Sequence, residues 1–223
     1  MPLGELNPVQ NLVALYHLSN TSDSSGNNYT LTNNNTVTFS DYAKFGKCAD
    51  FGTSNTNKYL NILNNNLGIS GSSDFTISAW VKLRTEIGSG SYDFINLNTG
   101  TTAGNTFYIL GYEYNSGNRR IYGYFGSNQI TYTTTLGTTN WYYLNIVRSS
   151  NNTYLYLNGA LVATGTVNLT TPASYGFGIG GQHNGANYSS AVIDEVAVFS
   201  KALSDREIAN YYQWASGRFA KLI

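Results

Sequence analysis

Two adjacent acidic residues lie in the last run of the chain that has the pattern of a β-strand. The run AVIDEVAVF spans residues 191–199, with Asp194 and Glu195 near its centre. Successive side chains of a strand point to opposite faces, so the alternation places Asp194 with Val196 and Val198, and Glu195 on the other face. Both faces are otherwise apolar, and an unpaired buried carboxylate is costly. We therefore expect at least one of the two acids to have a partner, which could be a cation, an arginine or backbone N–H groups.

This arrangement argues against catalysis. Glycoside hydrolases place two carboxyl groups on either side of one glycosidic bond, whereas two neighbouring acids in a strand point away from each other. The two histidines, His17 and His183, are far apart in the sequence, and the chain has no Gly-x-Ser-x-Gly motif. The sequence therefore favours a protein that is not an enzyme.

Composition excludes several kinds of partner. The 223 residues include 12 basic and 12 acidic side chains, so the formal net charge is zero. We therefore expect neither nucleic-acid binding nor attraction to an anionic membrane. The run of apolar residues needed for membrane insertion or for a secretory leader is also missing. The single cysteine, Cys48, excludes an internal disulfide.

Short alternating runs separated by Asn, Gly, Ser and Thr predict an all-β sandwich. In residues 75–83, the odd-numbered positions are apolar and face the expected core, while Thr76, Ser78, Trp80 and Lys82 face away. Asn158-Gly159 predicts a two-residue hairpin turn. Ser204 and Glu207 form a capping box that predicts a helix over about 204–216. We expect one domain over 1–223, with its core at about 10–200.

Several short segments, spread over most of the chain, resemble the laminin G-like members of the concanavalin A-like lectin/glucanase superfamily. They are residues 12–16, 23–27, 44–47, 50–51, 74–82, 141–143, 157–159, 178–181, 193–196 and 201–204. The resemblance implies a two-sheet antiparallel jelly roll in which the first and last strands pair. It implies little about function, because this fold carries lectins, hydrolases, adhesin segments and structural modules.

The resemblance also implies a calcium site. In this family, an early loop and the late strand often hold one Ca²⁺ between them, which places Asp23, Asn28 and Asp194 in the expected site. Calcium takes six to eight oxygen ligands. The alternative is an Asx-turn at Asp23 together with an Asp194 that is satisfied by backbone amides or by Arg148.

Tyrosines gather in the hairpin expected from residues 106–126. Sugar rings stack on exposed aromatic rings, and neighbouring amide side chains can hydrogen-bond to the hydroxyl groups. The alternative is ordinary cross-strand aromatic pairing. The candidate ligand-binding residues are Tyr112, Tyr114, Tyr122, Tyr124, Gln182 and Asn184.

The leading functional hypothesis is a non-catalytic, lectin-like module that binds a polysaccharide or a cell-surface glycan. We expect an extracellular setting, on a bacterial surface protein or a phage or virion attachment protein. A structural or decoration domain that binds protein partners is the alternative, and a glycoside hydrolase is the third hypothesis.

Overall fold

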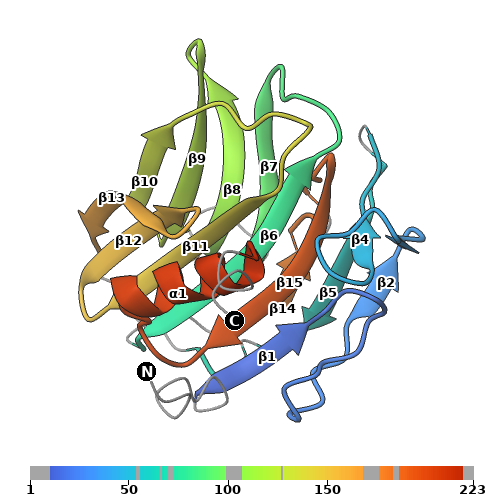
Figure 1. Ribbon diagram of the computed structural model, residues 1–223, viewed down its shortest axis with the longest axis horizontal. Coiled ribbons are helices and arrows are strands. Elements are labelled where there is room, and N and C mark those ends of the chain that lie inside the picture. The colour runs from blue at the N-terminus through green and yellow to red at the C-terminus, as the bar shows by residue number, and fades with distance from the viewer. Residues whose placement is uncertain are drawn as a thin grey trace.

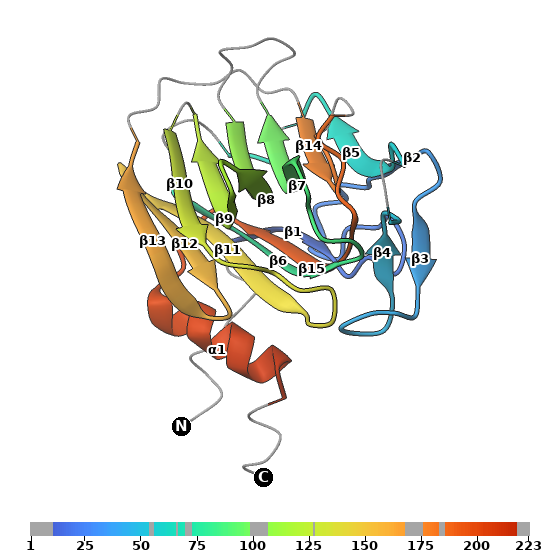
Figure 2. The ribbon, with the colours of Figure 1, turned by 90° about the horizontal axis from the view of Figure 1, so that it is seen from above.

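A computed structural model describes residues 11–53, 56–65, 67–69, 73–98, 107–126, 128–167, 176–182 and 186–217. Two antiparallel sheets face each other in these parts of the chain, as Figure 2 shows. The eight-stranded sheet has the order β13 (Ala160–Thr166), β12 (Asn152–Leu157), β11 (Tyr142–Ser149), β6 (Phe75–Leu83), β15 (Ala191–Phe199), β4 (Cys48–Asp50) and β3 (Thr38–Ser40). Its eighth strand, β1 (Leu12–Tyr16), pairs with β15, so the predicted pairing of the first and last strands is confirmed.

The second sheet has seven strands in the described part of the chain. Their order is β10 (Asn128–Thr133), β9 (Asn118–Phe125), β8 (Phe107–Asn115), β7 (Gly90–Asn98), β14 (Gly176–Ile179), β5 (Tyr59–Leu63) and β2 (Thr32–Asn34). The predicted all-β jelly-roll sandwich is therefore confirmed.

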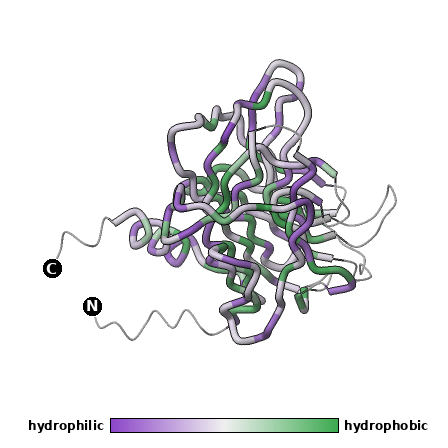
Figure 3. The backbone as a smooth tube through the Cα atoms, turned by 90° about the vertical axis from the view of Figure 1, so that its right-hand side faces the viewer, coloured by the Kyte–Doolittle hydropathy of each residue, from purple (hydrophilic) through white to green (hydrophobic). Residues whose placement is uncertain are grey.

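The core lies between the two sheets, where hydrophobic residues concentrate (Figure 3). The predicted alternation in β6 is confirmed, because Phe75, Ile77 and the next three odd-numbered residues all belong to this core. The ring of Phe75 lies 4.6 Å from that of Tyr108 on β8, and this edge-on contact joins the two sheets. Thr76, Ser78, Trp80 and Lys82 are left on the outer face of the eight-stranded sheet.

One helix, α1 (Asp205–Ala215), packs against that outer face (Figures 1 and 2). It begins at the predicted capping box, in which the Ser204 side chain accepts a hydrogen bond from the Glu207 N–H and the Glu207 side chain accepts one from the Ser204 N–H. The ring of Tyr212 stacks on that of Trp80, with 5.8 Å between centroids. Nowhere in the described chain is there a helix long and apolar enough to span a bilayer.

The predicted Asn-Gly hairpin joins β12 to β13 and also supports the helix. Asn158 and Gly159 have φ angles of +51° and +81°, which a primed turn requires. A Cβ atom at Gly159 would lie 3.0 Å from the side chain of Tyr212, so glycine permits the close approach of hairpin and helix.

Candidate functional site

The strand that carries the two acids contains a β-bulge. Asp194 lies opposite Trp80 of β6, but the next paired residue is Ala197, opposite Ser78. The extra residue is accommodated at Glu195, which has a φ of +49°. A bulge of this kind changes the direction of a side chain and interrupts the strict alternation of a strand.

The bulge corrects the predicted assignment of faces. Val196 and Val198 belong to the core between the sheets, whereas Asp194 shares the outer face with Trp80. The prediction that Asp194 lies on the face of these two valines was therefore wrong, because the alternation is interrupted between them.

Asp194 finds its partners in the backbone. One carboxylate oxygen, Oδ2, accepts hydrogen bonds from the N–H groups of Lys44 and Phe45 at 2.9 and 2.8 Å, and Oδ1 accepts one from the Glu195 N–H at 2.9 Å. The side chain is fully buried, and this burial raises its pKa to about 7 in spite of these donors.

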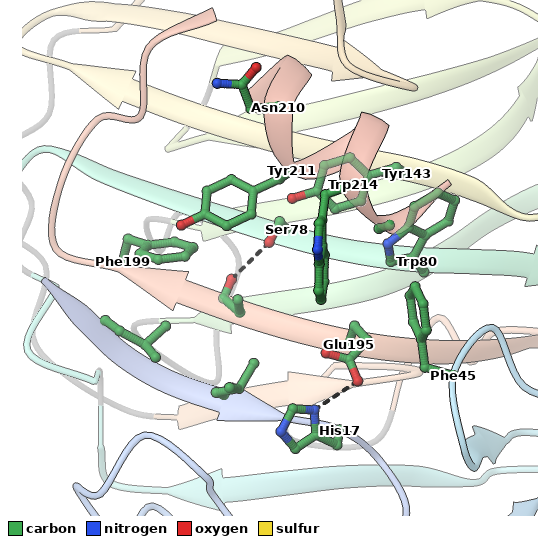
Figure 4. Close-up of a pocket in the computed structure, with 14 residues that line it drawn as sticks. His17, Phe45, Ser78, Trp80, Tyr143, Glu195, Phe199, Asn210, Tyr211 and Trp214 are labelled. Carbon is green, nitrogen blue, oxygen red and sulfur yellow. Dashed lines mark hydrogen bonds and ion pairs between the residues drawn. The ribbon is translucent and has the colours of Figure 1, made fainter. Parts of the chain in front are cut away.

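Glu195 projects to the opening of a pocket, where its Oε1 lies 2.7 Å from Nδ1 of His17 (Figure 4). The two side chains come from β15 and from the residue that follows β1. Because β1 pairs with β15 directly beyond the bulge, the sheet holds the two groups side by side.

The pocket itself lies between α1 and the outer face of the eight-stranded sheet, and it has a volume of about 350 Å³. This volume is at the lower end of the range for small-molecule sites. The lining residues are Leu12, Leu15, His17, Phe45, Ser78, Trp80, Tyr143, Glu195, Ala197, Phe199, Asn210, Tyr211, Trp214 and Ala215.

Aromatic rings form a large part of the pocket wall. Trp214 projects from α1 toward Glu195, and Phe45 and Trp80 lie together at one end (Figure 4). The rings of Phe45 and Trp214 are within 24° of parallel, with centroids 6.4 Å apart. Trp214 is nevertheless 71% exposed. An exposed indole beside an imidazole, a carboxylate and the Asn210 amide offers both a stacking surface and hydrogen-bonding groups to a ligand.

The predicted tyrosines divide between the two faces of the seven-stranded sheet. Tyr112 is fully buried in the core, where its hydroxyl oxygen accepts a hydrogen bond from the Leu136 N–H at 3.0 Å. Tyr114 packs against the same core and lies under the Arg119 guanidinium. Tyr122 and Tyr124 point to the outer face, where Tyr124 is half-buried and Tyr122 is 2% exposed.

A buried aspartate holds Tyr122 and Gln182 together. The Tyr122 hydroxyl donates a hydrogen bond to Asp93, and the Gln182 amide donates another to the same carboxylate at 2.9 Å. The structure therefore joins two of the predicted ligand-binding residues through a third residue that the sequence analysis did not select. Asn184 lies outside the described residues.

The two aspartates predicted to bind calcium both have hydrogen-bond partners within the protein. Asp23 Oδ1 accepts hydrogen bonds from the N–H groups of Leu15 and Ser25, and Oδ2 accepts bonds from the Ser25 hydroxyl and the Tyr29 N–H. Four donors use the lone-pair positions of one carboxylate, which leaves none for a cation.

Asn28 is the third residue predicted to bind calcium. Asn28 is exposed and has a φ of +61°, as a turn residue does. The described residues contain no group of three or more His, Cys, Asp or Glu side chains that could hold a metal ion. This geometry favours the Asx-turn, and calcium binding stays a prediction that can be tested by melting.

The sequence analysis did not find the pocket, although two signals point toward it. The adjacent acids in an apolar strand mark the bulge, and Tyr211, Trp214 and Ala215 have the i, i+3, i+4 spacing of one helical face. Trp214, on this helical face, borders the pocket and remains mostly exposed.

Solved structures with this fold include Domain 4 of AbnA, a GH43 extracellular arabinanase from Geobacillus stearothermophilus, in complex with arabinotriose. It is 22% identical to this chain, has a TM-score of 0.67, and the alignment covers 91% of this chain and 98% of that domain. The binding domain of Paraclostridial Mosquitocidal Protein 1 is 21% identical, with a TM-score of 0.65 and coverage of 92% and 52%. The binding domain of botulinum neurotoxin serotype C1 is 17% identical, with a TM-score of 0.69 and coverage of 92% and 52%.

These identities establish similarity of fold. The chain spans about half the length of the latter two binding domains. No curated protein sequence matches it. A laminin G-type family model described as the Concanavalin A-like lectin/glucanases superfamily matches residues 52–209. The chain therefore belongs to the concanavalin A-like lectin/glucanase superfamily.

Proposed function

We propose that the chain is a non-catalytic carbohydrate-binding module and that the sugar binds in the pocket beneath α1. The observation that carries this proposal is the exposed Trp214 indole, which stands beside the His17–Glu195 pair at the opening of an aromatic pocket. A sugar ring can stack on the indole while its hydroxyl groups meet the carboxylate, the imidazole and the Asn210 amide.

Two further observations support this proposal. A domain of similar fold was solved with arabinotriose, so the scaffold is compatible with oligosaccharide binding in that protein. Within the pocket, Glu195 is the lining carboxylate, and Asp194 is enclosed by backbone N–H groups. Asp194 and Glu195 therefore do not form the pair of carboxyl groups that flanks a glycosidic bond in glycoside hydrolases.

The setting that we propose is extracellular, on a bacterial surface protein or on a phage or virion attachment protein. A structural or decoration domain is the alternative. The exposed Trp214 favours it, because a projecting aromatic side chain can also anchor a protein partner.

A glycan array followed by titration calorimetry on the best oligosaccharide tests the proposal. Trp214→Ala should weaken binding by about 1–3 kcal/mol, the size of an aromatic hot spot. The matched control is Tyr132→Ala, which removes an aromatic ring that is 39% exposed on β10 of the other sheet.

Two results would count against the proposal. Wild-type affinity in Trp214→Ala, with a loss in Tyr132→Ala or Tyr124→Ala, would move the site to the seven-stranded sheet. If no glycan on the array is bound and the protein self-associates tightly in sedimentation, the structural role would be favoured over carbohydrate binding.

A further inference from the structure

Beyond the Phe45 and Trp80 end of the pocket, three basic side chains lie over aromatic rings. They are Lys44, Lys82 and Arg84, and together with the ring of Tyr42 we call them the cationic cluster. Tyr42 and Lys44 lie in the loop between β3 and β4, and the other two residues lie at the end of β6 and just after it. Trp80 connects the cluster to the pocket, because its ring lines the pocket and also lies under the Lys44 ammonium group.

Lys82 is the most unusual member. Lys82 as a whole is only 8% exposed, and its Nζ lies 4.3 Å from the centroid of the Tyr42 ring. The ammonium group has no hydrogen bond and no carboxylate within ion-pair distance in the described part of the chain. The aliphatic stem of the side chain is therefore covered by protein, whereas the ammonium group is not among the described buried nitrogens that lack a partner and so keeps contact with solvent.

The ammonium group of Lys44 also lies over aromatic rings. Its Nζ lies 4.5 Å from the centroid of the Trp80 ring and 5.6 Å from that of Phe45. Burial lowers the pKa of this ammonium group, and the nearby Asp194 opposes that shift. As with Lys82, no carboxylate lies within ion-pair distance among the described side chains.

The carboxylates near the cluster have other partners. Asp50 is 3.3 Å from the guanidinium of Arg84, and Asp41 is 3.6 Å from the ammonium group of Lys47. Asp194 is held by backbone N–H groups. Lys44 and Lys82 are therefore two positive charges of the cluster that these carboxylates compensate only in part.

Tyr42 gives the cluster a surface for stacking. Its side chain is 49% exposed, with Lys82 at 4.3 Å and the Arg84 guanidinium at 5.5 Å from the ring centroid. An exposed ring bordered by cations suits a ligand that has both a ring face and an anionic group.

We propose that the cationic cluster binds the anionic groups of an acidic polysaccharide while an adjacent sugar unit occupies the pocket. This inference rests on the proposed function, and it names the class of glycan. The orientation follows from charge, because Glu195 at the pocket opening repels a carboxylate or sulfate there, whereas Lys44 and Lys82 attract it. The sugar in the pocket is therefore uncharged, and the acidic unit lies over the cluster.

The test compares three probes by calorimetry: oligogalacturonate for carboxylate groups, sulfated dextran oligosaccharide for sulfate groups, and neutral arabino-oligosaccharide. Each is measured at about 0.01 M and about 1 M salt, where the Debye lengths are about 30 and 3 Å. We expect at least one acidic probe to bind about tenfold more tightly than the neutral probe at low salt, and to lose that advantage at high salt.

Substitutions assign the effect to the cluster. Lys82→Met keeps the length of the side chain, and it should weaken binding of the acidic probe about tenfold while leaving the neutral probe unaffected. Lys82→Arg should retain most of the affinity. The matched control is Lys58→Met, which removes the same charge just before β5 of the other sheet. Melting curves establish that each variant is folded.

The outcomes separate this inference from the proposed function. If the neutral probe binds, Trp214→Ala abolishes that binding, and acidic probes bind no more tightly, then the inference is overturned and the proposed function stands. Equal losses in Lys82→Met and Lys58→Met would show nonspecific charge attraction and would also overturn it. If no glycan binds on the array, both proposals fail.

Discussion

The tyrosine-rich hairpin of β8 and β9 and the outer face beneath α1 contain similar residue types but use them differently. In the hairpin, Tyr112 is fully buried, and Tyr122 is 2% exposed and bonded to a buried aspartate. Beneath α1, Trp214 is 71% exposed at the opening of a pocket. An abundance of aromatic residues in the sequence therefore did not locate the surface that is open to a ligand.

The difference arises from what covers each face. Tyr112 faces the opposite sheet and contributes to the core. On the other sheet, a helix packs over Trp80 and Tyr143 but leaves a gap beside β1, where the bulge turns Glu195 outward. A helix lying on a sheet thus leaves a binding surface at its margin.

The largest expected effect tests the assignment of Tyr112 to the core. Tyr112→Ala should reduce the free energy of unfolding by about 3–5 kcal/mol, as is usual for the loss of a buried aromatic side chain. Tyr112→Phe should cost about 1 kcal/mol, because only the hydroxyl that accepts the Leu136 N–H is lost. Urea unfolding measures both. Near-native stability of the alanine variant would restore this residue as a candidate for sugar binding.

The second prediction concerns the buried Asp194 of the other region. Its pKa of about 7 is higher than the ordinary value of 3.8, so the folded state holds a proton more tightly than the unfolded chain. The free energy of unfolding should therefore fall as the pH rises from about 4 to about 7, by at most about 1.4 kcal/mol per pH unit from this group, and then level off.

Asp194→Asn isolates this contribution. The difference in stability between the wild type and the variant should change across that pH range, because most other ionisable groups cancel. A difference that is constant from pH 4 to pH 7 would show that the carboxyl group keeps its ordinary pKa.

A smaller effect is expected at Asn145, on the same outer face. Its side chain is fully buried, and both of its amide atoms lack a hydrogen-bond partner among the described residues. Replacing an unpaired buried amide with an apolar group of similar size removes a desolvation cost, so Asn145→Leu should raise the free energy of unfolding by about 1 kcal/mol. Destabilisation in urea would instead indicate that the amide binds a buried water molecule.

The smallest effect is expected from calcium. Four donors already occupy the Asp23 carboxylate, so we expect the same melting temperature in excess EDTA and in millimolar Ca²⁺. A clear rise with calcium that Asp23→Ala or Asp194→Asn abolishes would establish the calcium site, since a ligand bound only by the folded state raises its stability.

Much of the fold was predictable because it follows from local patterns. The odd-numbered apolar positions of β6, the Asn158-Gly159 turn and the Ser204 capping box each act within a few residues. The candidate site was far less predictable. The pocket takes its lining from β1, the loop at Phe45, β6, β11, β15 and α1, and no pattern within one segment shows that these six parts meet.

The sequence by itself determined the alternation in β6, the Asn158-Gly159 turn, the start of the helix and the need of Asp194 for a partner, because these depend on local geometry and on the cost of burying charge. Only the tertiary structure decided which partner Asp194 has, where the bulge turns Glu195, and that Lys44 and Lys82 meet aromatic rings beside the pocket. Those outcomes depend in part on contacts between residues that are 150 or more positions apart in the chain, and such contacts exist only once the sheets are assembled.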